Sequence, residues 1–328
     1  MSDVSLAPSY RIAELTQEGA VVPDRTTIAV AICTFKRNDL LTRLLEGLIV
    51  CAERMTARAA VGIVLVDDTP EGMARPVAEA FTDRFELGLQ YRISGRQNIS
   101  LARNLAIETA MEMAERTVMT DDDCEPPPEW LEALLDAHQQ SKADAVTGRI
   151  VRRVPDGSPR WITEQPFLEL GVEELPDGAE MTSAATFNTM ISSGWLKAHP
   201  DIRFDPHFGV VSGEDVIFFR AARAAGLSIR FSERAFIYEN EPADRATFGY
   251  QLYVHYWHGN SSTLSSIQSG MSRGRMFVHG AASFVRALAR PFFRLAKGRP
   301  PQLRFALAQT LHASGKLLGT VGVRVDHR

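Results

Sequence analysis

Three consecutive carboxylates, Asp121, Asp122 and Asp123, are the strongest sign of chemistry in this sequence. They follow a short apolar run, and their mutual repulsion is costly unless a cation or strong hydrogen-bond donors compensate. Mg²⁺ or Mn²⁺ is typically held by one or two carboxylates together with phosphate oxygens of a substrate, so carboxylates two residues apart at a strand end indicate a metal site. The alternative is a solvated acidic turn ahead of three prolines at 126–128.

Two further acidic pairs are candidates for function. Asp67 and Asp68 end an apolar run, where a carboxylate can accept hydrogen bonds from a ribose or a base; the alternative is an Asp-Asp-Thr-Pro turn. Glu214 and Asp215 begin a helical pattern, and the helix dipole there favours an ionised carboxylate that could act as a general base. Ordinary helix capping is the alternative for this second pair.

A basic and amide-rich segment, RQNISLARN, could bind an anion. It places Arg96, Asn98, Arg103 and Asn104 where a strand passes into a helix, and helix-terminal amides with guanidinium donors suit a diphosphate. Either arginine could instead pair with the acidic body of the protein. The sequence lacks a G-x-G-x-x-G loop, a G-x-x-x-x-G-K-[ST] loop and a G-x-S-x-G elbow, which disfavours dehydrogenases, kinases and serine hydrolases.

The elements that must position these residues alternate between strands and helices. Apolar runs at 27–35, 61–66, 89–93 and 117–120 predict strands, and helical spacing over 40–49, 76–85, 100–115 (capped by Ser100) and from Trp130 predicts helices between them. This order indicates a mainly parallel sheet covered on both faces, in which ligands bind at the carboxyl ends of the strands. The polar clusters at 34–38, 67–69 and 121–123 all fall at such ends.

Composition fits one large domain with an appendage. The 328 residues are 45% hydrophobic and 23% charged, which excludes a disordered tail and a disulfide scaffold. Three cysteines, Cys33, Cys51 and Cys124, form no C-x-x-C pair, and with no secretory leader we expect a cytoplasmic protein. We expect Met1–Arg25 to be a loosely ordered lead-in, and the uncharged stretch 246–272 is too polar to span a bilayer.

Taken in order, the motifs resemble those of the family 2 inverting glycosyltransferases, which have the GT-A fold and use a nucleotide-diphosphate sugar. The resemblance spans about Thr27 to Asn260. It is carried by VAICTFKRNDLLTRLLEGL, VLVDDTPEG, NISLARNLAIETA, TDDDCEPPPEWL and GEDVIFFRAARAAG, which look like the opening strand, the V-D-D segment, the A-R-N helix, the D-x-D metal motif and the E-D catalytic segment.

The resemblance implies a role for each matching residue. Asp215 would be the general base, with Glu214 beside it, and Asp121 and Asp123 would hold Mn²⁺ or Mg²⁺ against the diphosphate of a UDP-sugar. The nucleotide would be contacted by Thr34, Arg37, Asp68, Arg96, Arg103 and Asp122, of which Thr34 and Asp68 would face the uracil-ribose portion and Asp122 the ribose.

Two departures from the family pattern refine this expectation. Many relatives have a histidine metal ligand after the late strand, where this chain reads FIYENEP, which leaves Glu239 as the substitute ligand. The Q-x-x-R-W motif of processive synthases is replaced by YQLYVHYWHGNSS, so we expect transfer of a single sugar. That segment resembles the R-x-x-x-G-x-S region of bacterial exopolysaccharide glucosyltransferases of the succinoglycan type.

The end of the chain is strongly basic. From Arg245 to Val325 there are 11 basic residues and no acidic one, whereas the remainder carries a net charge of −15. Residues 277–297 interleave phenylalanine and leucine with arginine and lysine, which predicts a helix on an anionic membrane surface, and 298–301 breaks it from a second helix. A helical pair packed on the body or on a second subunit is the alternative.

We therefore expect a lead-in over 1–25, a GT-A domain over 26–260 and a basic helical extension over 261–328. The acceptor would be a saccharide, polyprenyl-diphosphate-linked, at the inner face of the cell membrane, and no nucleic-acid partner is expected because no nucleic-acid fold accompanies the charge. A sugar-phosphate nucleotidyltransferase, which should carry an early glycine-rich loop, and a non-enzymatic polysaccharide- or membrane-binding module are the alternatives.

Overall fold

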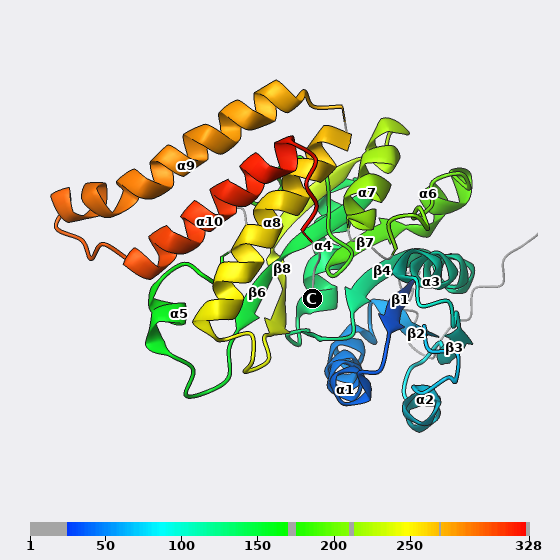
Figure 1. Ribbon diagram of the computed structural model, residues 1–328. Helices are drawn as coiled ribbons and strands as arrows, with labels where there is room; N and C mark the ends of the chain where they lie inside the picture. Colours follow the sequence, from blue (N-terminus) through cyan, green and yellow to red (C-terminus); the bar gives the residue numbers. More distant parts are fainter. Residues whose placement is uncertain (1–24, 170–174, 210–212, 269, 326–328) are drawn as a thin grey trace, which may run out of the picture.

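The computed structural model describes residues 25–169, 175–209, 213–268 and 270–325, so all of the predicted lead-in except its last residue lies outside the described residues (Figure 1). One eight-stranded sheet runs through the molecule in the order β3-β2-β1-β4-β7-β6-β8-β5. Its strands are β1 (Thr26–Thr34), β2 (Ala59–Asp67), β3 (Leu89–Ile93), β4 (Arg116–Asp121), β5 (Cys124–Glu125), β6 (Ala145–Arg153), β7 (Thr189–Ser192) and β8 (Ile229–Asn240).

The sheet is mixed. The pairs β3–β2, β2–β1, β1–β4 and β6–β8 are parallel, whereas β7 is antiparallel to both of its neighbours and β5 is antiparallel to β8. All nine residues of β2 are buried, as expected for a strand covered on both faces. In the parallel part the carboxyl ends coincide, because Cys33 pairs with Asp121 and Thr34 pairs with Asp67. The predicted clusters of polar side chains therefore share one edge.

Helices cover both faces of this sheet and form two apolar cores. Ile28, Val30 and Ile32 of β1 point into one core, and Ala29 and Ala31 point into the other. The first core includes residues of α1 (Asn38–Met55), α2 (Arg75–Phe81) and α4 (Trp130–Ser141). The second includes residues of α3 (Ile99–Met113), α6 (Ser193–Ala198) and α7 (Glu214–Ala224). This alternation along β1 is the period-two pattern of a strand between two layers.

The prediction that Ser100 caps the third helix is wrong. α3 begins one residue earlier, and its N-cap is Asn98, whose side chain accepts a hydrogen bond from the backbone N–H of Leu101. Ser100 lies inside the first turn and is buried. Asparagine is at least as good an N-cap residue as serine. The side-chain amide of Asn98 also donates a hydrogen bond to the carbonyl of Pro206, in addition to accepting the capping hydrogen bond.

Three long helices complete the fold: α8 (Phe248–Gln268), α9 (Arg273–Ala296) and α10 (Leu303–Thr320). The predicted break between two basic helices is confirmed. α9 and α10 form an antiparallel hairpin in which α10 lies between α8 and α9 (Figure 1). The predicted domain boundary at residue 260 falls inside α8, where Asn260 donates to the carbonyls of Gly315 and Val323. The division into domains stays a prediction.

A third apolar cluster joins the irregular stretch after β6 to these helices. Trp161 of α5 (Arg160–Glu164) and Phe167 meet at 4.9 Å between ring centroids, and Phe167 meets Phe305 of α10 at 5.2 Å. Within the described residues, no helix combines the length and the hydropathy that crossing a bilayer requires. The three cysteines are free, and Cys51 and Cys124 are buried.

Candidate active site

The carboxyl ends of β1, β2 and β4 open into a cavity of about 480 Å³. It is lined by most of the residues predicted to bind nucleotide and metal: Thr34, Arg37, Asp68, Arg103, Asp121, Asp122 and Asp123. Arg96, which is exposed, is the one predicted nucleotide ligand that is not among the residues lining this cavity. The sequence clusters are therefore brought together by the shared strand edge.

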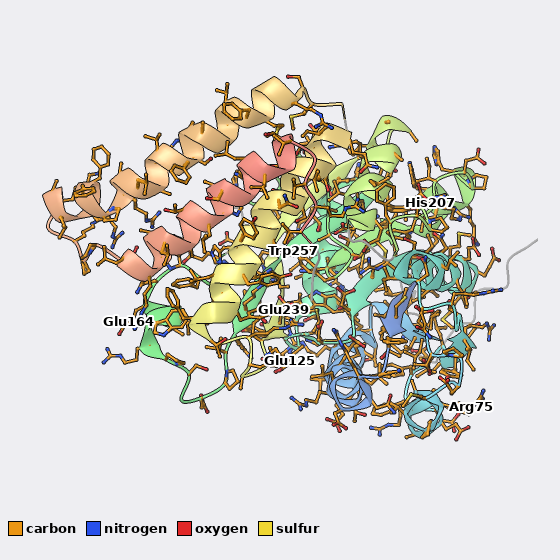
Figure 2. All side chains as sticks on the ribbon, viewed as in Figure 1. Arg75, Glu125, Glu164, His207, Glu239 and Trp257 are labelled. Atoms are coloured by element: carbon orange, nitrogen blue, oxygen red, sulfur yellow. The ribbon has the colours of Figure 1, made fainter. Side chains whose placement is uncertain are left out.

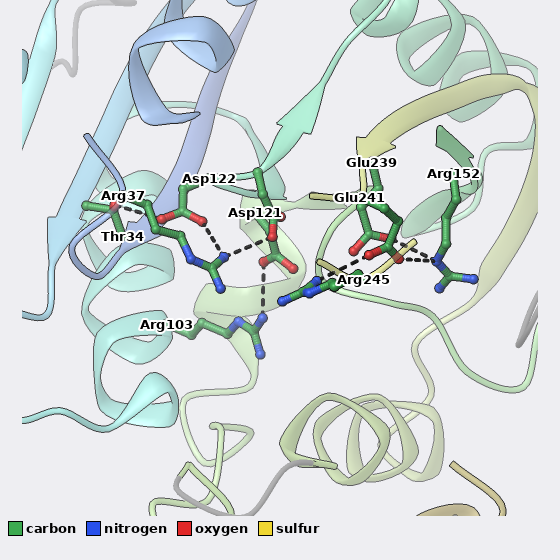
Figure 3. A network of polar contacts seen from close by, with 10 residues as sticks. Thr34, Arg37, Arg103, Asp121, Asp122, Arg152, Glu239, Glu241 and Arg245 are labelled. Atoms are coloured by element: carbon green, nitrogen blue, oxygen red, sulfur yellow. Dashed lines mark hydrogen bonds and ion pairs between the residues drawn. The ribbon is translucent and has the colours of Figure 1, made fainter. Parts of the chain in front are cut away.

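Asp122 is the most enclosed carboxylate of the triplet. Thr34 Oγ1 donates to its Oδ2 at 2.8 Å, and Arg37 Nη1 donates to its Oδ1 at 3.1 Å (Figure 3). Burial raises the pKa of Asp122 to about 6, although Arg37 and the Thr34 hydroxyl oppose that shift. Both carboxylate oxygens of Asp122 thus accept hydrogen bonds from the protein. These bonds hold the turn that places Asp121 and Asp123 at the cavity.

Arg103 links the D-D-D turn to the start of α7. Its guanidinium, which is mostly buried, donates to Asp121 Oδ1 at 3.1 Å and also donates to Glu214 Oε1. Burial opposes the charge, but the two carboxylates raise the pKa of Arg103. Glu214 is thereby tied to the cavity by an ion pair. It does not cap α7, whose N-cap is Gly213.

Asp121 and Asp123 fit a divalent cation by the chemistry of their donors. Both present carboxylate oxygens to the cavity, and burial together with the charge of Asp121 raises the pKa of Asp123. A bound cation would relieve that repulsion, and two carboxylates are the number that Mg²⁺ commonly uses beside phosphate oxygens. Each carboxylate is held by one guanidinium, Asp121 by Arg103 and Asp123 by Arg37.

Glu239 lies beside this pair on the neighbouring strand and is engaged elsewhere. Cys124, the residue after Asp123, lies in β5 and pairs with Glu239 of β8. The glutamate is therefore one strand away from the end of the D-D-D turn. Its Oε2 accepts a hydrogen bond from Arg152 Nε at 2.9 Å (Figure 3). Among the described residues, no group of three or more His, Cys, Asp and Glu side chains is arranged to hold a metal ion. The role of Glu239 as a third ligand stays a prediction.

Asp67 and Asp68 separate into a structural and a cavity-lining residue. Asp67 is fully buried and accepts hydrogen bonds from the backbone of Thr69 and Ala74 and from the hydroxyl of Tyr91, so the turn interpretation holds for it. Asp68 lines the cavity and accepts a hydrogen bond from the backbone N–H of Arg96 at 3.1 Å.

Asp215 lines a second cavity, of about 320 Å³, between α7 and α8. Burial raises the pKa of Asp215 to about 6, and the neighbouring charge of Glu214 adds to that shift. The cavity is also lined by Arg220, by Trp257 and His258, and by the hydroxyls of Ser261, Ser262, Ser265 and Ser266. Trp257 lies on α8 near the centre of the molecule (Figure 2). An aromatic ring, several hydroxyls and a carboxylate with a raised pKa form a surface suited to a polyhydroxylated substrate.

Sequence reasoning did not identify these α8 residues. The segment YQLYVHYWHGNSS carried a resemblance to exopolysaccharide glucosyltransferases, but that resemblance assigned no role to Trp257, His258 or the serines that follow. It also did not identify Phe35 and Gln97 in the first cavity, where Gln97 has a backbone φ of +50°. Asn104, a candidate anion ligand, instead exchanges two hydrogen bonds with the backbone of Phe204.

Known proteins resemble the chain in sequence and in fold. Residues 29–199 match the family described as Glycosyl transferase family 2. The succinoglycan biosynthesis protein ExoM of Rhizobium meliloti (strain 1021) is 27% identical over 310 residues, which cover 92% of this chain and 96% of that protein.

Two solved structures share the fold at low sequence identity. S. aureus TarS 1-349 aligns with a TM-score of 0.51 at 18% identity, over 70% of this chain and 64% of TarS 1-349. GalNAc-T7 with UDP, GalNAc and Mn²⁺ aligns with a TM-score of 0.50 at 14% identity, over 74% of this chain and 50% of GalNAc-T7. This chain therefore spans less than two thirds of either solved chain.

Proposed function

Since the chain belongs to glycosyl transferase family 2, we propose that it transfers one sugar from a UDP-sugar to a saccharide acceptor, with inversion at the anomeric carbon. It is a glycosyltransferase with a GT-A-like α/β fold, as the order of its motifs implies. The observation that supports this proposal best is the joining of two acidic motifs through Arg103, which binds both Asp121 at the donor cavity and Glu214 beside Asp215.

The donor would occupy the cavity at the carboxyl ends of β1, β2 and β4. Thr34, Asp68 and Asp122 would face the nucleoside, and Arg37 and Arg103, the two arginines that line the cavity, would face the diphosphate. GalNAc-T7, which has the same fold, was solved with UDP, which supports a uridine nucleotide. Asp121 and Asp123 would hold Mn²⁺ or Mg²⁺, which when bound neutralises charge on the departing diphosphate.

The acceptor would enter the cavity between α7 and α8. Asp215 removes a proton from the acceptor hydroxyl, whose oxygen then forms a bond to the anomeric carbon as the bond to the nucleotide diphosphate breaks. The raised pKa of Asp215, about 6, lies close to the range in which a general base works best near neutral pH. Trp257 would stack on an acceptor sugar ring, and the α8 serines would hydrogen-bond its hydroxyls.

The product would belong to a surface or exopolysaccharide, with a lipid-linked acceptor. ExoM, which matches this chain over most of its length, is a succinoglycan biosynthesis protein, and this likeness supports the polysaccharide class. The family match favours a transferase over a sugar-phosphate nucleotidyltransferase or a binding module, because residues 29–199 include the D-D-D turn.

A nucleotide titration tests the donor site. Purified protein is titrated with UDP, GDP, ADP and TDP by calorimetry, with and without Mn²⁺, and the series is repeated on the Asp121→Asn/Asp123→Asn variant. We expect UDP to bind most tightly, with Mn²⁺ strengthening its binding in the wild type and having no effect in the variant. The proposal would be contradicted if no nucleotide binds under any condition. If Mn²⁺ strengthens UDP binding equally in both proteins, the two aspartates do not hold the metal ion.

A further inference from the structure

The hairpin of α9 and α10 leaves a broad apolar face uncovered in the described structure. Met276, Gly280 and Ala287 form the buried stripe of α9, and Gly280 lies against Leu317 of α10. Figure 2 shows side chains projecting outward along α9. The exposed ones on the hairpin are Phe277, Val278, Val285, Leu288, Phe292, Phe293, Leu295, Leu303 and Leu307.

These residues form a surface with helical periodicity. Val278, Val285 and Phe292 recur every seven residues and so share one face of α9, with Leu288 and Leu295 on the adjoining row. Phe292 is 73% exposed and Val285 is 65% exposed, far beyond the single exposed leucines that any protein surface carries. A contiguous apolar patch of this kind marks an interaction surface.

The same hairpin carries only positive charge. Between Arg273 and Thr320 there are nine arginines and lysines and no aspartate or glutamate. Five of these cations, Arg286, Arg290, Arg294, Lys297 and Arg299, line one groove of about 520 Å³ that also includes the ring of Phe293. Among the described residues, no hairpin cation forms an ion pair with a carboxylate.

This combination selects one kind of partner. Two copies joined symmetrically through the hairpin would bring nine cations against nine cations, with no carboxylate in either hairpin to balance them. A phospholipid surface offers what both features need, because its headgroups carry clustered phosphates and its acyl boundary accepts apolar side chains. A helix with phenylalanine and leucine on one face and arginine and lysine on the other is the form that binds there.

We propose that the α9–α10 hairpin docks on an anionic phospholipid bilayer, with the exposed apolar face of α9 in the headgroup–acyl boundary and the basic groove receiving lipid phosphates. α10 joins this surface to α8, which lines the cavity of Asp215. Docking would therefore hold the acceptor cavity close to the membrane, and this consequence for acceptor choice rests on the proposed function. Binding to the bilayer itself requires neither donor nor acceptor.

Vesicle flotation with the full chain tests the docking surface. Binding is measured to vesicles of phosphatidylcholine and to vesicles of phosphatidylcholine mixed with phosphatidylglycerol, at low and high NaCl. We expect binding to the anionic vesicles only, weakened by salt. Arg286→Gln/Lys297→Gln should reduce the partition coefficient about fivefold per charge, which is about 25-fold in total. Val285→Ser/Phe292→Ser should reduce it by about tenfold or more.

A matched variant outside the hairpin distinguishes the effect of the hairpin surface from the effect of the protein's overall charge. Arg43→Gln/Arg84→Gln with Val50→Ser removes two exposed cations and an exposed valine outside the hairpin, and should leave vesicle binding within about twofold of the wild type. The proposal is overturned if the wild type fails to float with anionic vesicles, or if body and hairpin variants behave alike. It is also overturned if Val285→Ser/Phe292→Ser abolishes self-association in place of vesicle binding. UDP affinity, measured on the same preparations, reports separately on the donor site.

Discussion

At the residue scale, Asp215 carries the greatest weight in the proposed mechanism. It lines the cavity between α7 and α8, whereas its neighbour Glu214 is paired with Arg103 at the donor cavity. Two adjacent acids at the start of one helix thus face different surroundings. The difference supports Asp215 over Glu214 as the proposed base, because the carboxylate of Glu214 is already engaged by a guanidinium.

Replacing that base should slow the reaction without weakening donor binding. For Asp215→Asn we expect kcat to fall about 10²- to 10⁴-fold, since the amide cannot accept the acceptor proton, while the affinity for UDP and Mn²⁺ stays within about twofold. Steady-state rates and calorimetry measure the two quantities. Asp83→Asn, at an exposed site after α2, is the control and should match the wild type. A kcat for Asp215→Asn within a few-fold of the wild type would rule out its role as the base.

The pH profile follows from the raised pKa of the same carboxyl group. Burial, with the charge of Glu214, raises the pKa of Asp215 to about 6, and only the ionised form can accept a proton. Activity is therefore present above this pKa and lost below it, so kcat should fall about tenfold per pH unit below about pH 6. The pKa of Asp122 is also raised to about 6, so UDP affinity must be measured across the same range. A pH-independent kcat from 5 to 8 would contradict the assignment.

At the element scale, glycines set the distance between α8 and α10. A β-carbon at Gly259 would overlap the carbonyl oxygen of His312, and one at Gly315 would overlap the carbonyl oxygen of Tyr256. The two helices therefore approach each other through backbone contact, which only residues without a side chain permit. This contact holds the hairpin on the body of the protein.

Adding one methyl group at that contact should destabilise the protein. For Gly259→Ala we expect the free energy of unfolding to fall by about 1–3 kcal/mol, because α10 must move away. Gly274→Ala is the control, since a β-carbon there meets no atom within 4 Å and alanine favours the helix. Urea unfolding followed by circular dichroism measures both. Equal stability of the two variants would show that the α8–α10 contact is looser than the structure indicates.

At the scale of the whole molecule, the hairpin is joined to the body through a layer of three histidines, of which one is buried and two are half-buried. His255 and His258 on α8 meet His312 on α10, where the rings of His258 and His312 stack at 5.5 Å and His312 Nδ1 donates to the carbonyl of His255. Burial lowers the pKa of His255 to about 4, and burial with the nearby charge of Lys316 lowers that of His312 to about 3. The lowered pKa values favour the neutral form of these side chains in the folded protein near pH 7.

The stability of the molecule should therefore fall in acid, in part through His312. A group whose pKa is lower when folded than the 6.5 of the free side chain binds its proton first in the unfolded state, so its contribution is complete above about pH 6.5 and is lost toward pH 3. Between pH 7 and pH 5 that loss is on the order of 2 kcal/mol. His312→Asn keeps an N–H donor and should lose less stability over this range in urea unfolding. If the free energy of unfolding falls equally with pH in the two proteins, His312 does not contribute to the acid sensitivity.

Local sequence patterns predicted most of the helices and strands, because the spacing of apolar residues in each one reflects the face that it buries against the sheet or the helices. The strand at 89–93 has the predicted bounds, and the basic helices break where Gly298 and the prolines predict. β5, β6 and β7 were not predicted; of these, β5 and β7 have two and four residues and are too short to show a period. The helix cap at Ser100 was wrong because Asn98 offers a second hydrogen bond, to Pro206, that only folding brings within reach.

The sequence by itself determined which chemistry the chain carries: the order of its acidic motifs places it among glycosyltransferases, and the absence of acidic residues from Arg245 to Val325 makes that part of the chain basic. Tertiary structure alone decided the partners of those residues. It joined Asp121 to Glu214 through Arg103, turned Asp215 toward the serines of α8, and paired Glu239 with Arg152. Such pairings depend on strand register and helix packing between segments up to about a hundred residues apart, which no local pattern encodes.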